Sequence, residues 1–198
     1  MAATLILVRH AAHIHLNRIL SGRMPGVALS DAGRVQASRL ATRLATRGVD
    51  LVRSSPLDRA QATAAAIAAA AGVAVETAAG LQEIDFGAWT GLRFDELAGD
   101  AEWDQWNARR SAARPPGGES MGEAQARIVA HLDAVARDHA GRTIVLVSHA
   151  DMIRAAVAHA IGLNLDNLLR FDIDPASATT LVWGDSWARL TMLNERED

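Results

Sequence analysis

Two short apolar runs that end in a histidine constrain the fold of this chain more than any other feature. Residues 4–8 lead directly into Arg9 and His10. Residues 143–147 repeat this plan and lead to His149. Short apolar runs of this kind are typical of strands buried on both faces. Parallel strands carry their functional residues at one sheet edge, beyond their carboxyl ends, so we expect His10 and His149 to face each other across one pocket.

Helical patterns separate these strands, which favours an α/β fold. Ser30 is typical of a helix N-cap, and Ser120 forms a capping-box pattern with Glu123. A third helix has Ser55 at its cap and Pro56 at its first position. The expected helices cover residues 31–47, 56–72, 120–139 and 152–162, the further strands cover residues 50–54 and 73–77, and residues 171–193 form antiparallel strands turned at 184–186.

The length and composition of the chain predict one domain. The chain has 198 residues, 49% of them apolar, which is enough for one sizeable core. No linker or internal repeat divides it, so we expect a single domain over residues 1–198. A broken helical pattern at residues 94–114 carries Trp103 and Trp106. It is either a helix packed on the core or part of a lid over an anionic substrate, and the candidate lid insertion covers about residues 93–117.

The residue types that are missing exclude several reaction classes. The chain has no cysteine, and all 20 basic residues are arginine. These absences exclude disulfides, thiolate metal sites, cysteine nucleophiles, Schiff-base lysines and a lysine-containing P-loop. Arginine, by contrast, suits bidentate capture of phosphate. A formal charge of -3 predicts neither a nucleic acid nor a membrane as partner, and no apolar run approaches a membrane span, so we expect a cytoplasmic protein.

Three further segments carry candidate functional residues. Residues 11–27 form a long loop directly beyond the first strand, where functional residues tend to lie. Arg59 lies in the first turn of its helix, beside unpaired N–H groups and the positive end of the helix dipole, which together favour an anion. Glu83 and Asp85 lie among apolar and aromatic neighbours, where loss of solvent raises the pKa of a carboxyl group.

Four short motifs follow one another over almost the whole chain. They are Arg9-His10, residues 54–60 with Thr63, residues 81–83 followed by Phe86-Gly87 and Gly91, and Ser148-His149. In this order they resemble the histidine phosphatase superfamily, whose best-known members are the cofactor-dependent phosphoglycerate mutases. The resemblance implies a phosphoglycerate mutase-like fold, which is a three-layer α/β/α sandwich with a mostly parallel central sheet.

The resemblance also implies a role for each matching position. His10 resembles the nucleophile that becomes phosphohistidine, and Glu83 resembles the proton donor. Arg9, Arg59 and His149 resemble the clamp that holds the phosphate. This chemistry holds a phosphomonoester in line with a neutral imidazole, neutralises its charge and protonates the leaving oxygen, and it requires no metal or other cofactor. Further substrate contacts are implied for Asn17, Gly22, Arg23, Ser148 and Ala150.

The chain also departs from the family pattern. Ala11 and Ala12 stand where the family usually has Gly and Glu, and Asn17 is out of register with the family's asparagine. The chain looks shorter than a full phosphoglycerate mutase, whose extra segments close the site. The resemblance therefore favours a metal-independent phosphomonoesterase that acts on a small phosphorylated metabolite. A phosphoglycerate mutase and a non-catalytic protein that binds a phosphorylated ligand are the alternatives, and the sequence leaves the oligomeric state open, a dimer included.

Three weaker interpretations concern single residues. Asp85 competes with Glu83 for the role of the acid, and the register of the motif favours Glu83. His13 and His15 suggest a metal site together with His10, but no acidic or thiol ligand lies near them in the sequence. Residues 172–174 imitate an Asp-x-Asp nucleophile, but they lie too near the carboxyl terminus for the motifs that this chemistry needs.

Overall fold

The two apolar runs form neighbouring parallel strands at the centre of one sheet. In the computed structural model, which describes residues 1–196, they are β1 (Ala3–Arg9) and β4 (Thr143–Ser148). Arg9 lies opposite Ser148 in the register, so the two strands end at the same edge of the sheet. The strand ends therefore meet as the sequence predicts.

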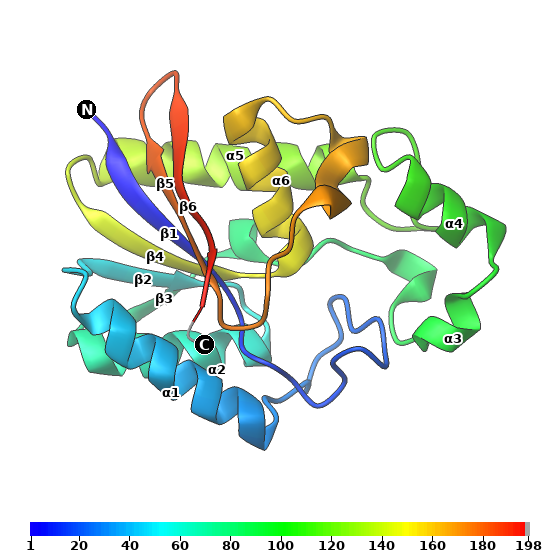
Figure 1. Ribbon diagram of the computed structural model, residues 1–198, viewed down its shortest axis with the longest axis horizontal. Helices are drawn as coiled ribbons and strands as arrows, with labels where there is room; N and C mark the ends of the chain where they lie inside the picture. The colour runs from blue at the N-terminus through cyan, green and yellow to red at the C-terminus, as the bar shows by residue number, and fades with distance from the viewer. Residues whose placement is uncertain (197–198) are drawn as a thin grey trace.

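Four further strands complete a six-stranded sheet in the order β3-β2-β4-β1-β5-β6. On one side, β2 (Leu51–Ser54) and β3 (Val75–Thr77) continue the parallel arrangement. On the other side, β5 (Ala178–Trp183) pairs antiparallel with β1, and β6 (Ala188–Glu195) pairs antiparallel with β5. The sheet is mostly parallel, with an antiparallel hairpin at one end (Figure 1).

Helices cover both faces of the sheet because its central strands are apolar on both sides. α1 (Asp31–Ala45) and α2 (Asp58–Ala71) lie below the sheet in Figure 1, and α5 (Met121–Asp138) and α6 (Ala150–Ile161) lie above it. Successive side chains of a strand point to opposite faces. In β1, Leu5 and Leu7 accordingly pack with α5 and α6, whereas Ile6 and Val8 pack with α1 and α2. The result is the expected three-layer α/β/α sandwich.

Two of the three predicted helix caps are confirmed. The Ser30 hydroxyl accepts a backbone N–H of α1, and Ser120 forms a capping box with Glu123. The prediction that Ser55 caps α2 is wrong, because that helix begins two residues later than expected and has no side-chain cap. The Ser55 hydroxyl instead lies 2.8 Å from Nε2 of His149, the residue directly after β4. Its hydrogen bond is thus to this histidine and not to the helix.

The carboxyl-terminal region is less extended than predicted. Residues 171–177 run as irregular chain after a short 3₁₀ helix, η3 (Leu165–Arg170), and cross the end of β1. There Arg9 Nη1 donates a hydrogen bond of 2.6 Å to the Ile173 carbonyl. The Arg9 backbone also bonds to this segment, with its N–H donating to the Ser177 carbonyl and its carbonyl accepting the Ala176 N–H. The predicted turn at residues 184–186 is present between β5 and β6.

The broken helical pattern corresponds to two short helices, α3 (Phe94–Leu97) and α4 (Ala101–Ala108). They lie on the right of Figure 1, away from the sheet. Two 3₁₀ turns, η1 (Ala79–Leu81) and η2 (Gly87–Trp89), lead into this region. Within residues 1–196, none of the helices is both long enough and apolar enough to cross a membrane.

Candidate active site

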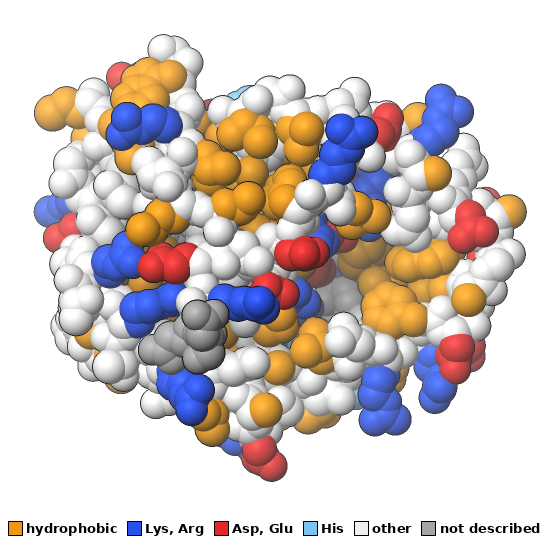
Figure 2. All heavy atoms as spheres, viewed as in Figure 1, with side chains coloured by type: hydrophobic (Ala, Val, Ile, Leu, Met, Phe, Trp, Pro, Cys, Tyr) orange, Lys and Arg blue, Asp and Glu red, His pale blue; other side chains and the backbone are white. Residues whose placement is uncertain are grey.

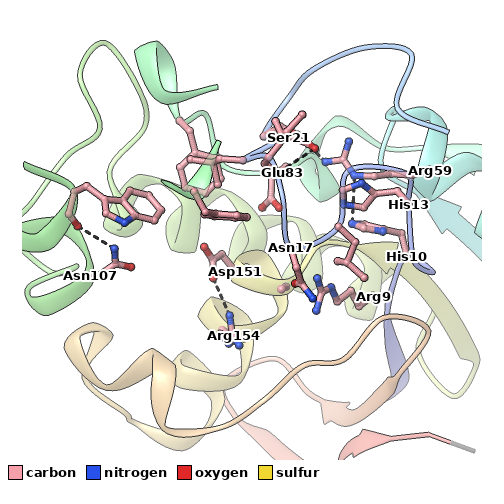
Figure 3. A pocket seen from close by; sticks show the side chains of 18 of the residues that line it. Arg9, His10, His13, Asn17, Ser21, Arg59, Glu83, Asn107, Asp151 and Arg154 are labelled. Carbon is pink, nitrogen blue, oxygen red and sulfur yellow. Dashed lines mark hydrogen bonds and ion pairs between the residues drawn. The ribbon is translucent and has the colours of Figure 1, made fainter. Parts of the chain in front are cut away.

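A cavity of about 280 Å³ opens where β1 and β4 end. Figure 2 shows the surface hollowed between the main body and the segment that carries α3 and α4, and Figure 3 shows the side chains of the cavity. The loop after β1, α2, the segment around α3 and α4, and α6 all contribute to its walls. The lining includes Arg9, His10, His13, Leu16, Asn17, Gly22, Arg59, Glu83, Phe86, Phe94, Trp103, Asn107, Arg110, Ala150, Asp151 and Arg154.

His10 presents a neutral ring nitrogen to the cavity. Its Nδ1 lies 2.9 Å from the carbonyl oxygen of Ala11, so Nδ1 carries the proton and Nε2 keeps its lone pair. Arg59 Nε donates to that Nε2 at 3.2 Å. Burial, followed by the positive charge of Arg59, holds the pKa of His10 well below its ordinary value. A neutral imidazole in this tautomer is the form that acts as a nucleophile.

The guanidinium groups of Arg59 and Arg9 lie near His10. Arg59 is 2% exposed, and its Nη2 donates to the Gly22 carbonyl at 2.7 Å. Arg9 donates through Nη1 to Ile173. Within residues 1–196, the buried Nη1 of Arg59 and Nε of Arg9 have no hydrogen-bond partner. Because an unpaired buried donor is costly, these two groups are suited to bind an anionic oxygen.

His149 completes the cluster from behind the cavity wall. It is fully buried, and its ring centroid lies 5.1 Å from that of His10. Its Nδ1 lies 3.4 Å from Arg59 Nη2 and 3.8 Å from Glu83 Oε2, and its Nε2 contacts Ser55. Burial, followed by the nearness of His10 and Arg59, holds the pKa of His149 well below its ordinary value. The two strand-end histidines thus lie close together at one edge of the sheet, but His149 is not among the residues that line the cavity, so they do not face each other across it as the sequence predicts.

Glu83 supplies a carboxyl group that is partly protonated at neutral pH. Its side chain is 12% exposed and lines the cavity. Burial, followed by the negative charge of Asp151, raises the pKa of Glu83 to about 7 against the opposing effects of Arg59 and Arg9. Its Oε1 accepts the backbone N–H of Ile84 at 3.0 Å. The expected effect of lost solvent on a carboxyl pKa is therefore found at Glu83.

The rival carboxylate, Asp85, lies outside the cavity lining. Its side chain is 41% exposed, and its Oδ1 accepts the backbone N–H of Gly87 at 2.9 Å. Its Oδ2 lies 3.4 Å from Nη1 of Arg23, so the carboxylate already has a charged partner. The geometry favours Glu83 for proton transfer, in agreement with the register of the motif.

Three charged residues hold the Glu83 loop in place. Arg23 Nε donates to the Glu83 carbonyl at 2.8 Å, and Arg127 Nη1 donates to the Gln82 carbonyl at 2.8 Å. Glu119 bridges the two arginines, at 3.0 Å from Arg23 and 2.8 Å from Arg127. The guanidinium of Arg23, expected to contact substrate, is thus turned to the Glu83 loop. The sequence carries no signal for Arg127, which is one of two arginines on a long helix.

The other expected substrate contacts divide into two groups. Asn17, Gly22 and Ala150 line the cavity. Ser148 lies behind it, fully buried, with its hydroxyl donating to the Leu81 carbonyl at 2.7 Å. Asn17 has a φ of 59°, a left-handed conformation that asparagine tolerates better than most residues.

The loop that follows β1 is held at both positions where the chain departs from the family. Ala11 N–H donates to Thr63 Oγ1 at 3.1 Å, and Ala12 N–H donates to Gln36 Oε1 at 3.0 Å. Gly33 packs so closely on the Ala12 carbonyl that a Cβ at that glycine would lie 1.8 Å from the oxygen. The first turn of α1 therefore fixes the position of this loop.

The segment of residues 93–117 contacts both the core and the cavity. Trp106 is fully buried in the core, and the Arg110 guanidinium lies 5.1 Å from the centroid of its ring. Phe94 and Trp103 line the cavity, with ring centroids 6.4 Å apart. The segment is anchored in the core by one tryptophan and forms an aromatic wall of the cavity with the other.

An ion-pair network of Arg110, Asp151 and Arg154 forms another part of the cavity wall. Asp151 accepts hydrogen bonds from Arg110 Nη1 at 2.9 Å and from Arg154 Nη1 at 3.2 Å. Burial opposes ionisation, but the two guanidinium groups hold the pKa of Asp151 below its ordinary value. No motif in the sequence marks Asp151 or Arg154 as functional. Their signal is positional, since both lie in the first turns of the helix that begins directly after His149.

Comparison with known proteins identifies similar chains over nearly the whole length. The model of the histidine phosphatase superfamily (branch 1) matches residues 5–196. Phosphoserine phosphatase 1 of Hydrogenobacter thermophilus is 34% identical over 182 residues, which cover 89% of this chain and 85% of that protein. A bifunctional protein of Mycobacterium tuberculosis is 34% identical over 96% of this chain, which spans 53%, about half, of that protein. The structure of a mycobacterial glucosyl-3-phosphoglycerate phosphatase superposes with a TM-score of 0.84 at 30% identity and covers 98% of this chain and 99% of its own.

Proposed function

This chain belongs to the histidine phosphatase superfamily (branch 1) and is a phosphoric monoester hydrolase. We propose that it works without a metal, through a phosphohistidine at His10, on a small phosphorylated metabolite. One observation carries the proposal. The Nε2 lone pair of His10, whose ring is held neutral, lies beside two guanidinium groups whose buried N–H groups have no hydrogen-bond partner in the described part of the chain. This is the arrangement that a nucleophile needs for attack on a phosphate dianion.

In the first step, the phosphate oxygens bind the free N–H groups of Arg9 and Arg59, and Arg59 Nε turns from His10 to the substrate. His10 Nε2 attacks phosphorus, so an N–P bond forms as the bond to the leaving oxygen breaks. Glu83, which is partly protonated because its pKa is about 7, gives its proton to that oxygen, and the product leaves as an alcohol. The hydrogen bond from Nδ1 to the Ala11 carbonyl stabilises the positive charge on the phosphorylated ring.

In the second step, water replaces the alcohol. The Glu83 carboxylate takes a proton from the water, whose oxygen attacks phosphorus as the N–P bond breaks. Inorganic phosphate is released, and His10 returns to its neutral form with Glu83 protonated. A pKa of about 7 suits both steps, since the acid and the base are both well populated at neutral pH.

The shape of the cavity supports a small organic leaving group. At about 280 Å³ it lies at the lower end of ligand sites in proteins. We place the leaving group between Trp103 and the pair of Asp151 and Arg154, with residues 93–117 acting as the lid. Phosphoserine and glucosyl-3-phosphoglycerate, from the names of the similar proteins, are the first two substrates to test.

The decisive experiment is trapping of the phosphoenzyme. Wild-type protein quenched during turnover of a ³²P-labelled phosphomonoester should carry acid-labile, base-stable label. His10→Ala should carry none and release no phosphate. His159→Ala, which removes a histidine that stacks on Trp183 away from the cavity, is the matched control and should label normally. Full labelling of His10→Ala would refute the mechanism.

Two alternatives have distinct outcomes in the same assays. A phosphoglycerate mutase would convert 3-phosphoglycerate to 2-phosphoglycerate faster than it releases phosphate. A non-catalytic binding protein would bind inorganic phosphate without turning over any phosphomonoester. The position of Glu83 argues against the latter, because a protein that only binds a phosphate ester has no use for a carboxyl group with a pKa of about 7 beside its two arginines.

A further inference from the structure

A second histidine from the loop after β1 lies beside the nucleophile. His13 lines the cavity, is 8% exposed, and has its ring centroid 5.3 Å from that of His10 (Figure 3). A metal site formed by His13, His15 and His10 is disfavoured by the sequence, which places no acidic or thiol ligand near them. Among residues 1–196, no group of three or more His, Cys, Asp or Glu side chains is arranged to hold a metal ion. The proposed roles of His10, Glu83 and the arginines leave His13 without a function.

Hydrogen bonding fixes the tautomer of the His13 ring. Nδ1 accepts the backbone N–H of His15 at 3.2 Å, so the single proton of the neutral ring is on Nε2. Among the hydrogen bonds within residues 1–196, this is the one bond that the His13 side chain makes. The backbone is held as well, because His13 forms an isolated antiparallel bridge with Leu29. The loop therefore presents an oriented, unused N–H donor at the cavity.

We propose that His13 binds the transferred phosphoryl group by donating its Nε2–H to a phosphoryl oxygen, an inference that rests on the phosphohistidine chemistry proposed above. The Arg59 guanidinium contacts the same nucleophile from another side, and Arg9 precedes it in β1. A preorganised donor at this place stabilises the charge on the equatorial oxygens during transfer. The two arginines supply positive charge, and His13 adds a neutral donor whose direction is set by the His15 backbone.

The charge state of His13 makes it a donor and not a proton carrier. Burial, followed by the positive charges of Arg59 and Arg9, lowers the pKa of His13 to about 4. The ring is therefore neutral at pH 7 and has no acidic proton for a leaving oxygen. Its contribution should be the same for good and poor leaving groups, whereas the contribution of Glu83 should depend on the leaving group.

A pair of variants separates hydrogen bonding from packing. His13→Phe keeps a ring of similar size without a donor, and His13→Gln keeps an N–H donor at the end of a side chain of similar length. We expect kcat/KM to fall roughly 10- to 100-fold in His13→Phe, the range for one hydrogen bond to a charged group, and to recover largely in His13→Gln. The affinity for inorganic phosphate, measured by calorimetry, should likewise fall more in His13→Phe than in His13→Gln. His15→Ala retains the backbone N–H that orients His13 and serves as the control.

The outcomes are distinguishable. Equal losses in His13→Phe and His13→Gln, or a smaller loss in His13→Phe, would show that the residue only fills space. A loss that grows with the pKa of the leaving group would make His13 an acid and overturn the proposal. If His13→Phe does not fold, the comparison of His13→Gln with His13→Ala decides in the same way. A wild-type protein that binds inorganic phosphate but forms no phosphoenzyme would instead refute the proposed function.

Discussion

The raised pKa of Glu83 has a consequence for stability that can be measured without any substrate. Its pKa is about 7 in the folded protein, against an ordinary value of 4.5. Between these two values the folded protein holds a proton that the unfolded chain has released, so stability falls as the pH rises from about 4.5 to about 7. Each pKa unit corresponds to about 1.4 kcal/mol, so the ionised carboxyl costs about 3 kcal/mol above pH 7.

Replacing Glu83 with glutamine should remove this cost. Glutamine is never ionised, and its amide oxygen can still accept the Ile84 N–H that Glu83 Oε1 accepts at 3.0 Å. The side chain is only 12% exposed, so screening by solvent is limited. We therefore expect Glu83→Gln to match the wild type at pH 4.5 and to be more stable by about 2–3 kcal/mol at pH 8.

Urea unfolding of both proteins between pH 4.5 and pH 8 measures this difference directly. Asp85→Asn is the control, because its side chain is 41% exposed and should give no stabilisation at high pH. A Glu83→Gln variant that gains nothing between the two pH values would refute the reasoning. It would mean that Arg9 and Arg59 outweigh burial and keep Glu83 ionised.

Three further predictions concern catalysis. Glu83→Gln should lower phosphorylation roughly a hundredfold or more with an alkyl phosphate and far less with p-nitrophenyl phosphate, whose leaving group needs no proton; the same pattern in Asp85→Asn would identify that residue as the acid. Activity should survive excess EDTA, because the proposed steps use no metal; a loss that Mg²⁺ or Zn²⁺ restores would contradict them. Gly33→Ala should lower both kcat and Tm, since its Cβ has to displace the Ala12 carbonyl at a cost of roughly 1–3 kcal/mol, and normal values would show that the loop yields easily.

The sequence predicts most of the framework because local patterns determine it. The apolar runs at β1 and β4 predict two strands at the centre of the sheet, and the pairing of these strands places Arg9 opposite Ser148. The Ser120 cap is predicted correctly because its partner, Glu123, lies three residues away. Where two interacting residues are close in the sequence, the local sequence pattern is sufficient to predict their contact.

The errors and omissions concern side chains whose partners are distant in the sequence. Ser55 looks like a helix cap, but its hydroxyl contacts His149, which is 94 residues away. Arg127 reaches back 45 residues to the Gln82 carbonyl, and no local pattern marks that contact. Asp151 looks like an ordinary helix residue until Arg110, 41 residues before it, is placed beside it. These contacts depend on the completed fold and cannot be read from a local pattern.

The order of strands in the sheet also determines when the site can assemble during synthesis. β1 is synthesised before the other strands of the sheet, but its two neighbours are β4 and β5. Leu5 can therefore pair with Ile144 and Leu181 only after these residues have been synthesised. At a typical translation rate this delay is roughly 10 to 30 s. During this delay, the apolar strand β1 has no strand to pair with. Pairing between strands that are distant in the sequence also slows folding. We expect the nucleophile to become reactive only after β4 and β5 have paired with β1.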